Sequence, residues 1–192
     1  MKEEKFKKEL EYIKDERVKK SLIYMINKLP DYFFEVPASS TGKYHPPYAQ
    51  NDGGLLRHTK AAVRIGYELL ADACIGDKYK SIEKDLMLMA LILHDGMKHG
   101  LTHERYVRFD HPLIMADVLE KEKDNLELNN EEIELVANCI RRHMGPYTTD
   151  YRGNEVLEKP KTKYENFVHM CDCLASKKIL VIPFDENNEI ID

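Results

Sequence analysis

The chain has 192 residues, of which 43% are hydrophobic and 33% charged, and its formal net charge is -5 at pH 7. This length and composition exclude a disordered chain and predict one domain over residues 1–192 with a core of its own. The negative charge excludes a protein that coats long nucleic acids, because that binding depends on many Lys and Arg side chains. The longest apolar run, residues 86–93, is too short to cross a bilayer, so we expect a cytoplasmic protein.

The first predicted element is a long amphipathic helix over residues 3–29, which ends before Pro30. Residues 37–54 are dense in Pro, Gly, Ser and Asn, which predicts a long loop, and long loops in compact domains are often functional. Residues 1–36 thus form the N-terminal helix and the start of this loop. The apolar positions of the helix stand three to five residues apart and are Phe6, Leu10, Ile13, Val18, Leu22, Met25 and Leu29.

Helical spacing of apolar residues continues through most of the remaining chain and predicts an all-α fold. The segment 86–93, LMLMALIL, is apolar on all sides, and its Met and Leu content favours a central helix over a buried strand. The residues ILVIPF, 179–184, are interpreted as a short extended tail. Further helices are predicted from Leu55 to about Cys74, from His111-Pro112 onward, over residues 131–143, and from Tyr164 to Lys177.

Ionisable side chains recur at inward positions of these helices. His58 stands on the apolar face of its helix, and His94 and Asp95 directly follow the central apolar run. His143 continues the apolar stripe of residues 131–143, and Asp172 lies on the last helix. One such His is more often a hydrogen-bonded core residue. Buried imidazoles and carboxylates on several helices instead favour a metal site or a strong hydrogen-bond network.

The chain contains, in this order, GGLLRHT, LILHDGMKHG, a His-Pro pair, RRHMG and CDCLASK. This ordered set resembles the HD-domain phosphohydrolase superfamily over residues 45–178, which leaves residues 179–192 as a tail. The phrase PASSTGKYHPPYAQNDGGLLRHT is similar to the catalytic half of the YhaM-type 3′-to-5′ exoribonucleases. The resemblance implies a compact HD-domain helical bundle and a metal-dependent phosphohydrolase.

The resemblance also implies a set of metal ligands. Mixed imidazole and carboxylate ligands suit one or two divalent ions of Mn, Fe, Co, Ni or Zn. Two ions about 3.5 to 4 Å apart can activate a bridging water, so the implied reaction is attack of a metal-bridging hydroxide on a phosphodiester in a nucleotide or short oligonucleotide. The first ion would take His58, His94, Asp95 and Asp172, and Asp95 would bridge to a second ion that takes His111 and His143.

Other candidates surround these ligands in the sequence. Lys98 matches a Lys of many HD relatives and is expected to act in catalysis by contacting a phosphate oxygen, with an ordinary surface Lys as the alternative. His45, which has a counterpart in the YhaM-type family, is a candidate substrate contact. Arg141 and Arg142 precede a ligand; either they bind substrate phosphate, for which Arg142 is the candidate, or they form surface ion pairs.

Three further histidines carry weaker signals. His99 and His103 are four residues apart, a spacing that can bind metal on a helix. Gly100 and the polar residues around them favour a flexible loop near the mouth of the site. His169 stands three residues before Asp172 and is either a neighbour of the ligands or a core residue.

The sequence also departs from its relatives. YhaM-type proteins carry an oligonucleotide-binding fold ahead of the HD domain, and here a Lys-rich helix and a loop stand there. We therefore expect nucleotide or few-nucleotide substrates, with no stable binding to long nucleic acids or membranes. HDGMK places Gly next to Asp95, unlike the commoner HD-x-Gly-Lys. The alternatives are a phosphomonoesterase, a dinucleoside polyphosphate hydrolase, or a nucleotide-sensing module without turnover.

Overall fold

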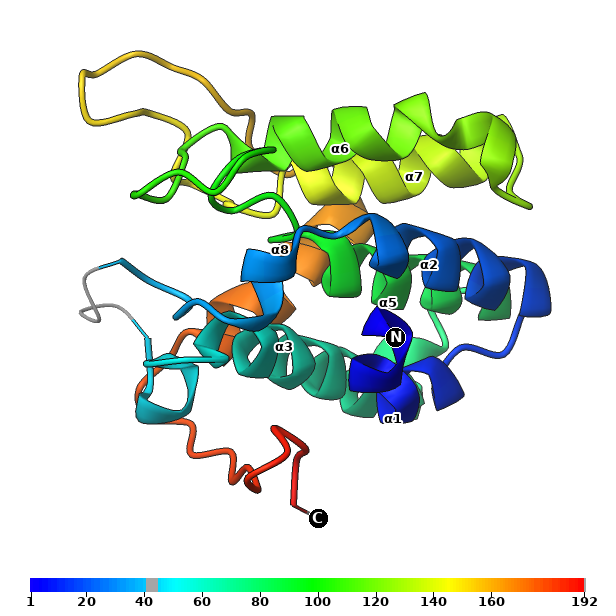
Figure 1. Cartoon of the computed structure of the whole chain (residues 1–192). Helices are drawn as coiled ribbons and strands as arrows, with labels where there is room; N and C mark the ends of the chain where they lie inside the picture. The colour runs from blue at the N-terminus through cyan, green and yellow to red at the C-terminus, as the bar shows by residue number, and fades with distance from the viewer. Residues whose placement is uncertain (41–44, 192) are drawn as a thin grey trace.

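The computed structural model describes residues 1–40 and 45–191, and its described part is helical without a β-strand (Figure 1). Two isolated β-bridges pair Thr149 with Glu155 and Phe184 with Ile190. The predicted all-α fold is therefore confirmed. The α-helices are α1 (Lys7–Glu11), α2 (Glu16–Lys28), α3 (Gly54–Ala71), α4 (Ala73–Gly76), α5 (Ser81–Leu93), α6 (His111–Lys121), α7 (Asn130–Arg141) and α8 (Lys163–Ala175). The 3-10 helices are η1 (Lys2–Phe6), η2 (Asp31–Phe34), η3 (Pro47–Ala49) and η4 (Lys123–Asn125).

Helix α5 is the centre of the bundle because its C-terminal two-thirds has no polar face. Residues 86–93 are all buried, and α5 packs against α2, α3, α7 and α8. In Figure 1 α5 lies in the middle layer, between α3 below and α7 above. The prediction of a central helix over this segment is confirmed. Because α5 is enclosed on all sides, the residues that directly follow it, His94 and Asp95, also lie in the interior.

The single helix predicted over residues 3–29 is wrong. The segment forms η1, α1 and α2, with a break ahead of Glu16. Asp15 begins α2 as its N-cap, because its Oδ1 accepts hydrogen bonds from the backbone N–H groups of Arg17 (2.8 Å) and Val18 (3.3 Å). The step of five residues from Ile13 to Val18 does not fit a helical face, which repeats every three or four residues.

A buried carboxylate of the central helix stabilises this break. Asp85 is 3% exposed, and its Oδ2 accepts hydrogen bonds from the backbone N–H groups of Lys14 (3.0 Å) and Asp15 (2.7 Å). These donors need a partner because the helix is interrupted there. The contact comes from residues about 70 positions away in the chain, so local sequence patterns do not reveal it.

Lys60 is a fully buried cation that joins α3 to segments near both ends of the chain. Its Nζ lies 2.5 Å from Glu189 Oε1 and 3.5 Å from Glu9 Oε2. Glu9 is 2% exposed, and burial raises its pKa although Lys60 acts in the opposite direction. One turn earlier, the Arg57 guanidinium donates to Asn188 Oδ1. These contacts hold the C-terminal segment against the helix that carries His58.

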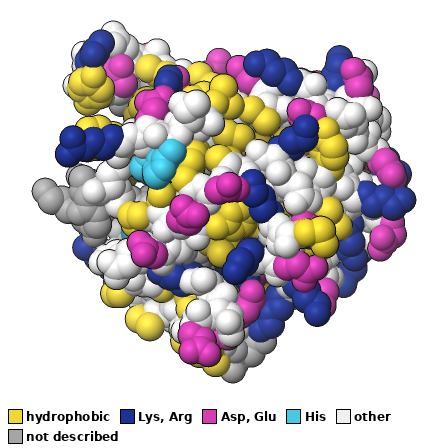
Figure 2. Space-filling view, in the orientation of Figure 1, with side chains coloured by type: hydrophobic (Ala, Val, Ile, Leu, Met, Phe, Trp, Pro, Cys, Tyr) yellow, Lys and Arg dark blue, Asp and Glu magenta, His cyan; other side chains and the backbone are white. Residues whose placement is uncertain are grey.

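Charges on the face shown in Figure 2 are mixed: basic and acidic side chains are interspersed and do not gather by sign. Among the described residues, no helix combines the length and the apolar character that crossing a membrane requires. The large apolar side chains that are most exposed within the chain include Leu101, Tyr106, Tyr147, Tyr151, Ile179 and Val181.

We predict that Lys60→Ala destabilises the fold by about 3 kcal/mol, because it leaves the buried Glu9 carboxylate without its cation. Chemical denaturation measures the change. The double variant Lys60→Met, Glu9→Gln removes both charges and should recover most of the loss. Lys19→Ala changes a half-buried lysine of α2 that pairs with the exposed Glu16, and it serves as the control. Equal unfolding midpoints for Lys60→Ala and Lys19→Ala would contradict this account.

Candidate metal centre

Helix ends bring the predicted ligands together. His94 follows the last residue of α5 and Asp95 comes next, so both enter the interior at the end of the buried helix. His111 is the first residue of α6, where Pro112 is tolerated because the first helical N–H groups have no partner within the helix. His143 lies two residues beyond α7. Four residues from three segments thus converge on one point.

Gly96 has a packing role next to the ligands. A Cβ at this position would lie 2.6 Å from Leu29 Cδ2 and 2.7 Å from Met115 Sδ. Both distances are shorter than any van der Waals contact, so a larger residue would push α6 or the end of α2 away from Asp95. Close packing therefore explains why HDGMK has its glycine directly after the His-Asp pair.

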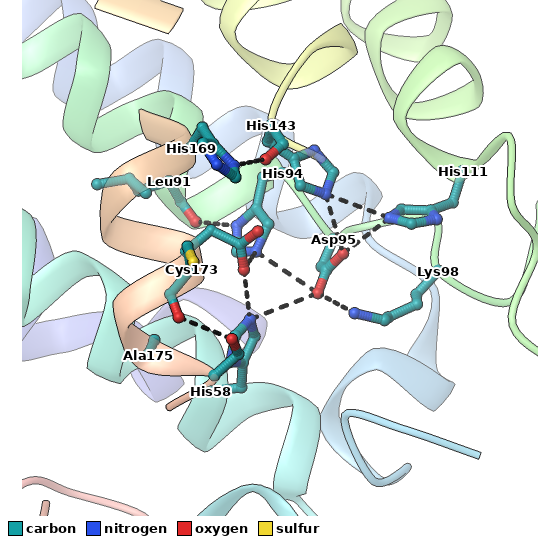
Figure 3. A network of polar contacts seen from close by, with 12 residues as sticks. His58, Leu91, His94, Asp95, Lys98, His111, His143, His169, Cys173 and Ala175 are labelled. Carbon is teal, nitrogen blue, oxygen red and sulfur yellow. Dashed lines mark hydrogen bonds and ion pairs between the residues drawn. The ribbon is translucent and has the colours of Figure 1, made fainter. Parts of the chain in front are cut away.

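Asp95 is the centre of the cluster and is 1% exposed (Figure 3). Its Oδ1 lies 2.9 Å from His111 Nε2 and 3.5 Å from His143 Nε2. Its Oδ2 lies 3.5 Å from His94 Nε2 and 3.7 Å from His58 Nε2. The two carboxylate oxygens therefore face two different pairs of imidazoles.

Asp172, from α8, completes one side of the cluster. Its Oδ1 lies 3.0 Å from His58 Nε2 and 3.5 Å from His94 Nε2. All six predicted ligands thus lie together. In three overlapping sets, the possible ligand atoms are all within 4.8 Å of one another: His58, His94 and Asp95; His94, His143 and Asp172; and Asp95, His111 and His143.

Backbone carbonyls fix the orientation of three of the rings. The Nδ1 atoms of His94, His111 and His143 lie 2.7, 2.6 and 2.8 Å from the carbonyl oxygens three residues earlier. A carbonyl oxygen only accepts, so each Nδ1 carries a proton and, in the neutral ring, Nε2 keeps a lone pair. His111 Nε2 and His143 Nε2 face each other at 3.3 Å. Two lone pairs repel at that distance unless a proton or a metal ion lies between them, so this donor set fits a divalent metal.

Burial and the neighbouring charges shift the pKa values within the cluster in opposite directions. Burial lowers the pKa of His111, although Asp95 opposes this shift. Burial also works against a charged ring at His94, but Asp95 and Asp172 raise its pKa to about 10. Although burial alone would raise it, Lys98 and His94 hold the pKa of Asp95 well below its ordinary value. The Asp95 carboxylate is therefore ionised inside the protein, where a cation stabilises it.

A cavity of about 820 Å³ opens over the cluster and contains two of the three predicted substrate contacts, His45 and Lys98. Lys98 is 8% exposed and its ammonium group forms an ion pair with Asp95 Oδ2. The His45 ring stands edge-on to the His58 ring, with 4.9 Å between centroids. His45 Nδ1 is buried without a hydrogen-bond partner among the described residues. Both side chains are placed where a ligand of the cavity would meet them.

Arg142 does not line this cavity. Its guanidinium lies 2.9 Å from Glu158 Oε2 and 3.1 Å from Glu165 Oε1, and Glu165 is 3% exposed. Arg141 forms an ion pair with Glu120. Of the two roles considered for these arginines, the structure therefore favours ion pairing.

His99 and His103 belong to a packed cluster rather than to the cavity. His99 is 5% exposed, its ring meets Tyr32 edge-on, and its Nδ1–H donates to the Glu104 carbonyl at 2.8 Å. His103 is exposed and stacks on Tyr32. His99 and His103 lie in the predicted loop between α5 and α6, and Tyr32 from η2, 67 residues before His99, packs against its ring.

His169 is a neighbour of the ligands. Its Nδ1–H donates to the His143 carbonyl at 2.7 Å, and its ring lines the cavity (Figure 3). The ring occupies the place of a side chain at Gly145, where a Cβ would lie 2.1 Å from it. Gly145 also has a φ of 63°, which favours glycine. The turn after α7 is therefore shaped to bring His169 against the backbone of a ligand.

Several cavity residues were not expected from the sequence. Phe109 and Met144 lie within two residues of ligand histidines, and Lys177 and Lys178 follow the helix of Asp172. That proximity to predicted ligands is the signal that could have found them. The lining residues that sequence reasoning did not single out are Ala38, Ser39, Ser40, Val107, Phe109, Met144, Tyr147, Cys173, Ser176, Lys177 and Lys178.

The fold and the cluster define a helical protein whose His and Asp side chains are able to hold divalent metal. Residues 55–177 match the HD domain family. The chain therefore belongs to the HD domain family.

Two curated relatives are similar to this chain, and both are named 3′-5′ exoribonuclease YhaM. The protein of Shouchella clausii (strain KSM-K16) is 28% identical over 148 residues, which cover 70% of this chain and 43% of the relative. The protein of Bacillus velezensis (strain DSM 23117 / BGSC 10A6 / LMG 26770 / FZB42) is 24% identical over 177 residues, which cover 88% and 51%. The chain thus spans about half the length of these relatives. No solved structure shows significant similarity to it.

We predict that Arg142→Ala lowers the free energy of unfolding by about 2 to 3 kcal/mol, because the buried Glu165 carboxylate loses its cation and keeps only backbone N–H donors. The KM for substrate should not change. Arg141→Ala is the matched control, and its exposed ion pairs should contribute less than about 1 kcal/mol. Thermal unfolding and steady-state kinetics measure both effects. A raised KM with unchanged stability would instead assign Arg142 to substrate binding.

Proposed function

We propose that this protein is a metal-dependent phosphohydrolase that cleaves a phosphodiester in a nucleotide or a short oligonucleotide. The observation that carries the proposal is the position of Asp95, whose two oxygens face separate pairs of imidazoles at the floor of a cavity. Membership of the HD family supports the reaction class. Hydrolysis forms a bond between water oxygen and phosphorus and breaks the ester P–O bond, and the leaving alcohol takes up the proton that water loses.

We further propose that two divalent ions of Mn, Fe, Co, Ni or Zn bind here, since imidazole and carboxylate together suit these metals. Bound ions supply an activated water and positive charge next to the phosphoryl oxygens. The first ion takes His58, His94, Asp95 and Asp172, and the second takes Asp95, His111 and His143.

The side chains of the protein have distinct tasks in this proposal. The backbone carbonyls that hold the Nδ1 protons keep the rings of His94, His111 and His143 in their ligating orientation. Lys98 provides an ammonium group at the cavity floor for a phosphate oxygen. Burial, together with the nearby His58 and Lys98, lowers the pKa of His45 to about 3, so its neutral ring offers a hydrogen bond to substrate.

The size of the cavity supports a small substrate. A volume of about 820 Å³ lies within the range of sites for small ligands, roughly 300 to 1,000 Å³. Both curated relatives are named exoribonucleases, which supports an oligonucleotide made of RNA. We therefore propose substrates of one to a few nucleotides.

The test is a substrate screen of the Mn-loaded protein. We expect short RNA or DNA oligonucleotides and simple phosphodiesters to be hydrolysed, and Asp95→Asn to abolish turnover while the helical content is retained. Phosphate release from nucleoside monophosphates alone would indicate a phosphomonoesterase. Cleavage of dinucleoside polyphosphates alone would indicate a hydrolase of those compounds. Tight nucleotide binding without any turnover would indicate a sensing module and would overturn the proposal.

We predict that substitutions at the two proposed metal positions remove different ions. His58→Ala removes a ligand of the first ion only, and His111→Ala removes a ligand of the second ion only. Each variant should therefore retain about one ion, whereas Asp95→Ala should lose both. Elemental analysis measures the metal content, and thermal unfolding identifies any variant that has simply lost its fold. If His111→Ala keeps two ions and full turnover, His111 is structural and one ion suffices.

A further inference from the structure

The cavity is positively charged apart from its proposed metal ligands. Its charged lining side chains, within the described residues, are Asp95, Asp172, Lys98, Lys177 and Lys178. Both carboxylates belong to the proposed metal centre, so every other charge on the wall is a lysine. The chain as a whole has a net charge of -5, and the cavity therefore differs in sign from the protein around it. Such a cavity concentrates anions.

These lysines occupy two distinct parts of the cavity. Lys98 lies at the floor, where it contacts the Asp95 carboxylate. Lys177 and Lys178 follow the end of α8, are exposed, and form no ion pair with a carboxylate of the described chain. One cation thus belongs to the metal centre, and a separate pair of ammonium groups is available to a second anionic group.

Another part of the wall is apolar. Phe109, Met144 and Tyr147 come from the turns next to the ligands His111 and His143. In Figure 1 the segments that precede α6 and follow α7 lie at the same end of the molecule. Tyr147 is 66% exposed, so its ring is accessible from solvent. Aromatic rings and a thioether are the surfaces on which nucleobases stack without strict sequence preference.

We infer that this cavity binds a dinucleotide unit with two phosphates, which deepens the proposed function and rests on it. The scissile phosphate lies at the metal centre beside Lys98, and a second phosphate lies at Lys177 and Lys178. A nucleobase packs on the apolar wall of Phe109, Met144 and Tyr147. A nucleoside monophosphate would fill the base and metal positions but leave the lysine pair without a partner. The cavity is therefore built for the end of an oligonucleotide strand.

The phosphate position is tested with dinucleotides that carry a terminal phosphate at the 5′ end, at the 3′ end, or at neither end. We expect one phosphorylated form to show a kcat/KM about tenfold higher than the unphosphorylated form, a gain that fits two exposed ion pairs. The double variant Lys177→Ala, Lys178→Ala should lose this advantage and hydrolyse all three dinucleotides with similar kcat/KM. Lys121→Ala, which changes an exposed lysine outside the cavity, is the control.

The base position is tested with Tyr147→Ala, and the exposed Tyr151, which does not line the cavity, supplies the matched control Tyr151→Ala. Loss of one stacking contact should weaken dinucleotide binding about fivefold or more. An abasic substrate should not distinguish Tyr147→Ala from the unaltered protein. Calorimetry with a phosphorothioate dinucleotide measures binding independently of turnover.

Equal kcat/KM for all three dinucleotides, or an advantage that persists in the double lysine variant, would overturn the inference while phosphohydrolase activity stands. If no phosphate ester is hydrolysed, the proposed function fails, and calorimetry still decides whether the lysine pair binds a second phosphate. A phosphorothioate dinucleotide that binds equally with and without its terminal phosphate would then overturn the inference.

Discussion

The structure depends on one ionised carboxylate held almost completely inside the protein. Asp95 would destabilise the fold if it stood alone, and it is tolerated because imidazoles approach both of its oxygens and Lys98 approaches one of them. The surrounding architecture serves this arrangement. Asp95 lies in the interior because it follows the buried helix α5. Because Gly96 has no side chain, α6 and the end of α2 can pack closely next to Asp95.

The predictable part of the fold is the part set by local periodicity. The central helix is predicted from a segment that is apolar on all sides and rich in Met and Leu, the helix at His111 from a Pro at a first helical position, and both are found. The break ahead of Glu16 has a local signal in the five-residue step from Ile13 to Val18, whereas the contact that stabilises it, with Asp85, lies far away in the sequence. The packing of His99 likewise depends on a distant residue, since Tyr32 covers it. Local patterns indicate elements, whereas contacts between distant segments decide where an element ends.

For the site, too, part could be predicted from the sequence and part depends on contacts between distant segments. The six proposed ligand positions are predictable from the sequence, some because an imidazole or a carboxylate lies on an apolar stripe, and all because their order resembles a known family. The residues of the cavity wall could not be predicted from the sequence in this way. Phe109 and Tyr147 are ordinary aromatic residues in polar turns, and Lys177 is an ordinary lysine near a helix C-terminus, a position that favours cations in any case. Only the folded chain shows that these side chains share one space with Asp95.

His58 and Asp172 approach each other across 114 residues of chain, from the third and the last α-helix. The ion-binding site that we propose is therefore absent from the unfolded chain and is complete only once α8 has docked. Any ion that binds the finished site and ignores the unfolded chain shifts the folding equilibrium by RT ln(1 + [M]/Kd), with [M] the free ion concentration. If the proposed ions bind, the supply of metal in the surroundings helps to determine how much of this protein is folded and how long it survives proteolysis.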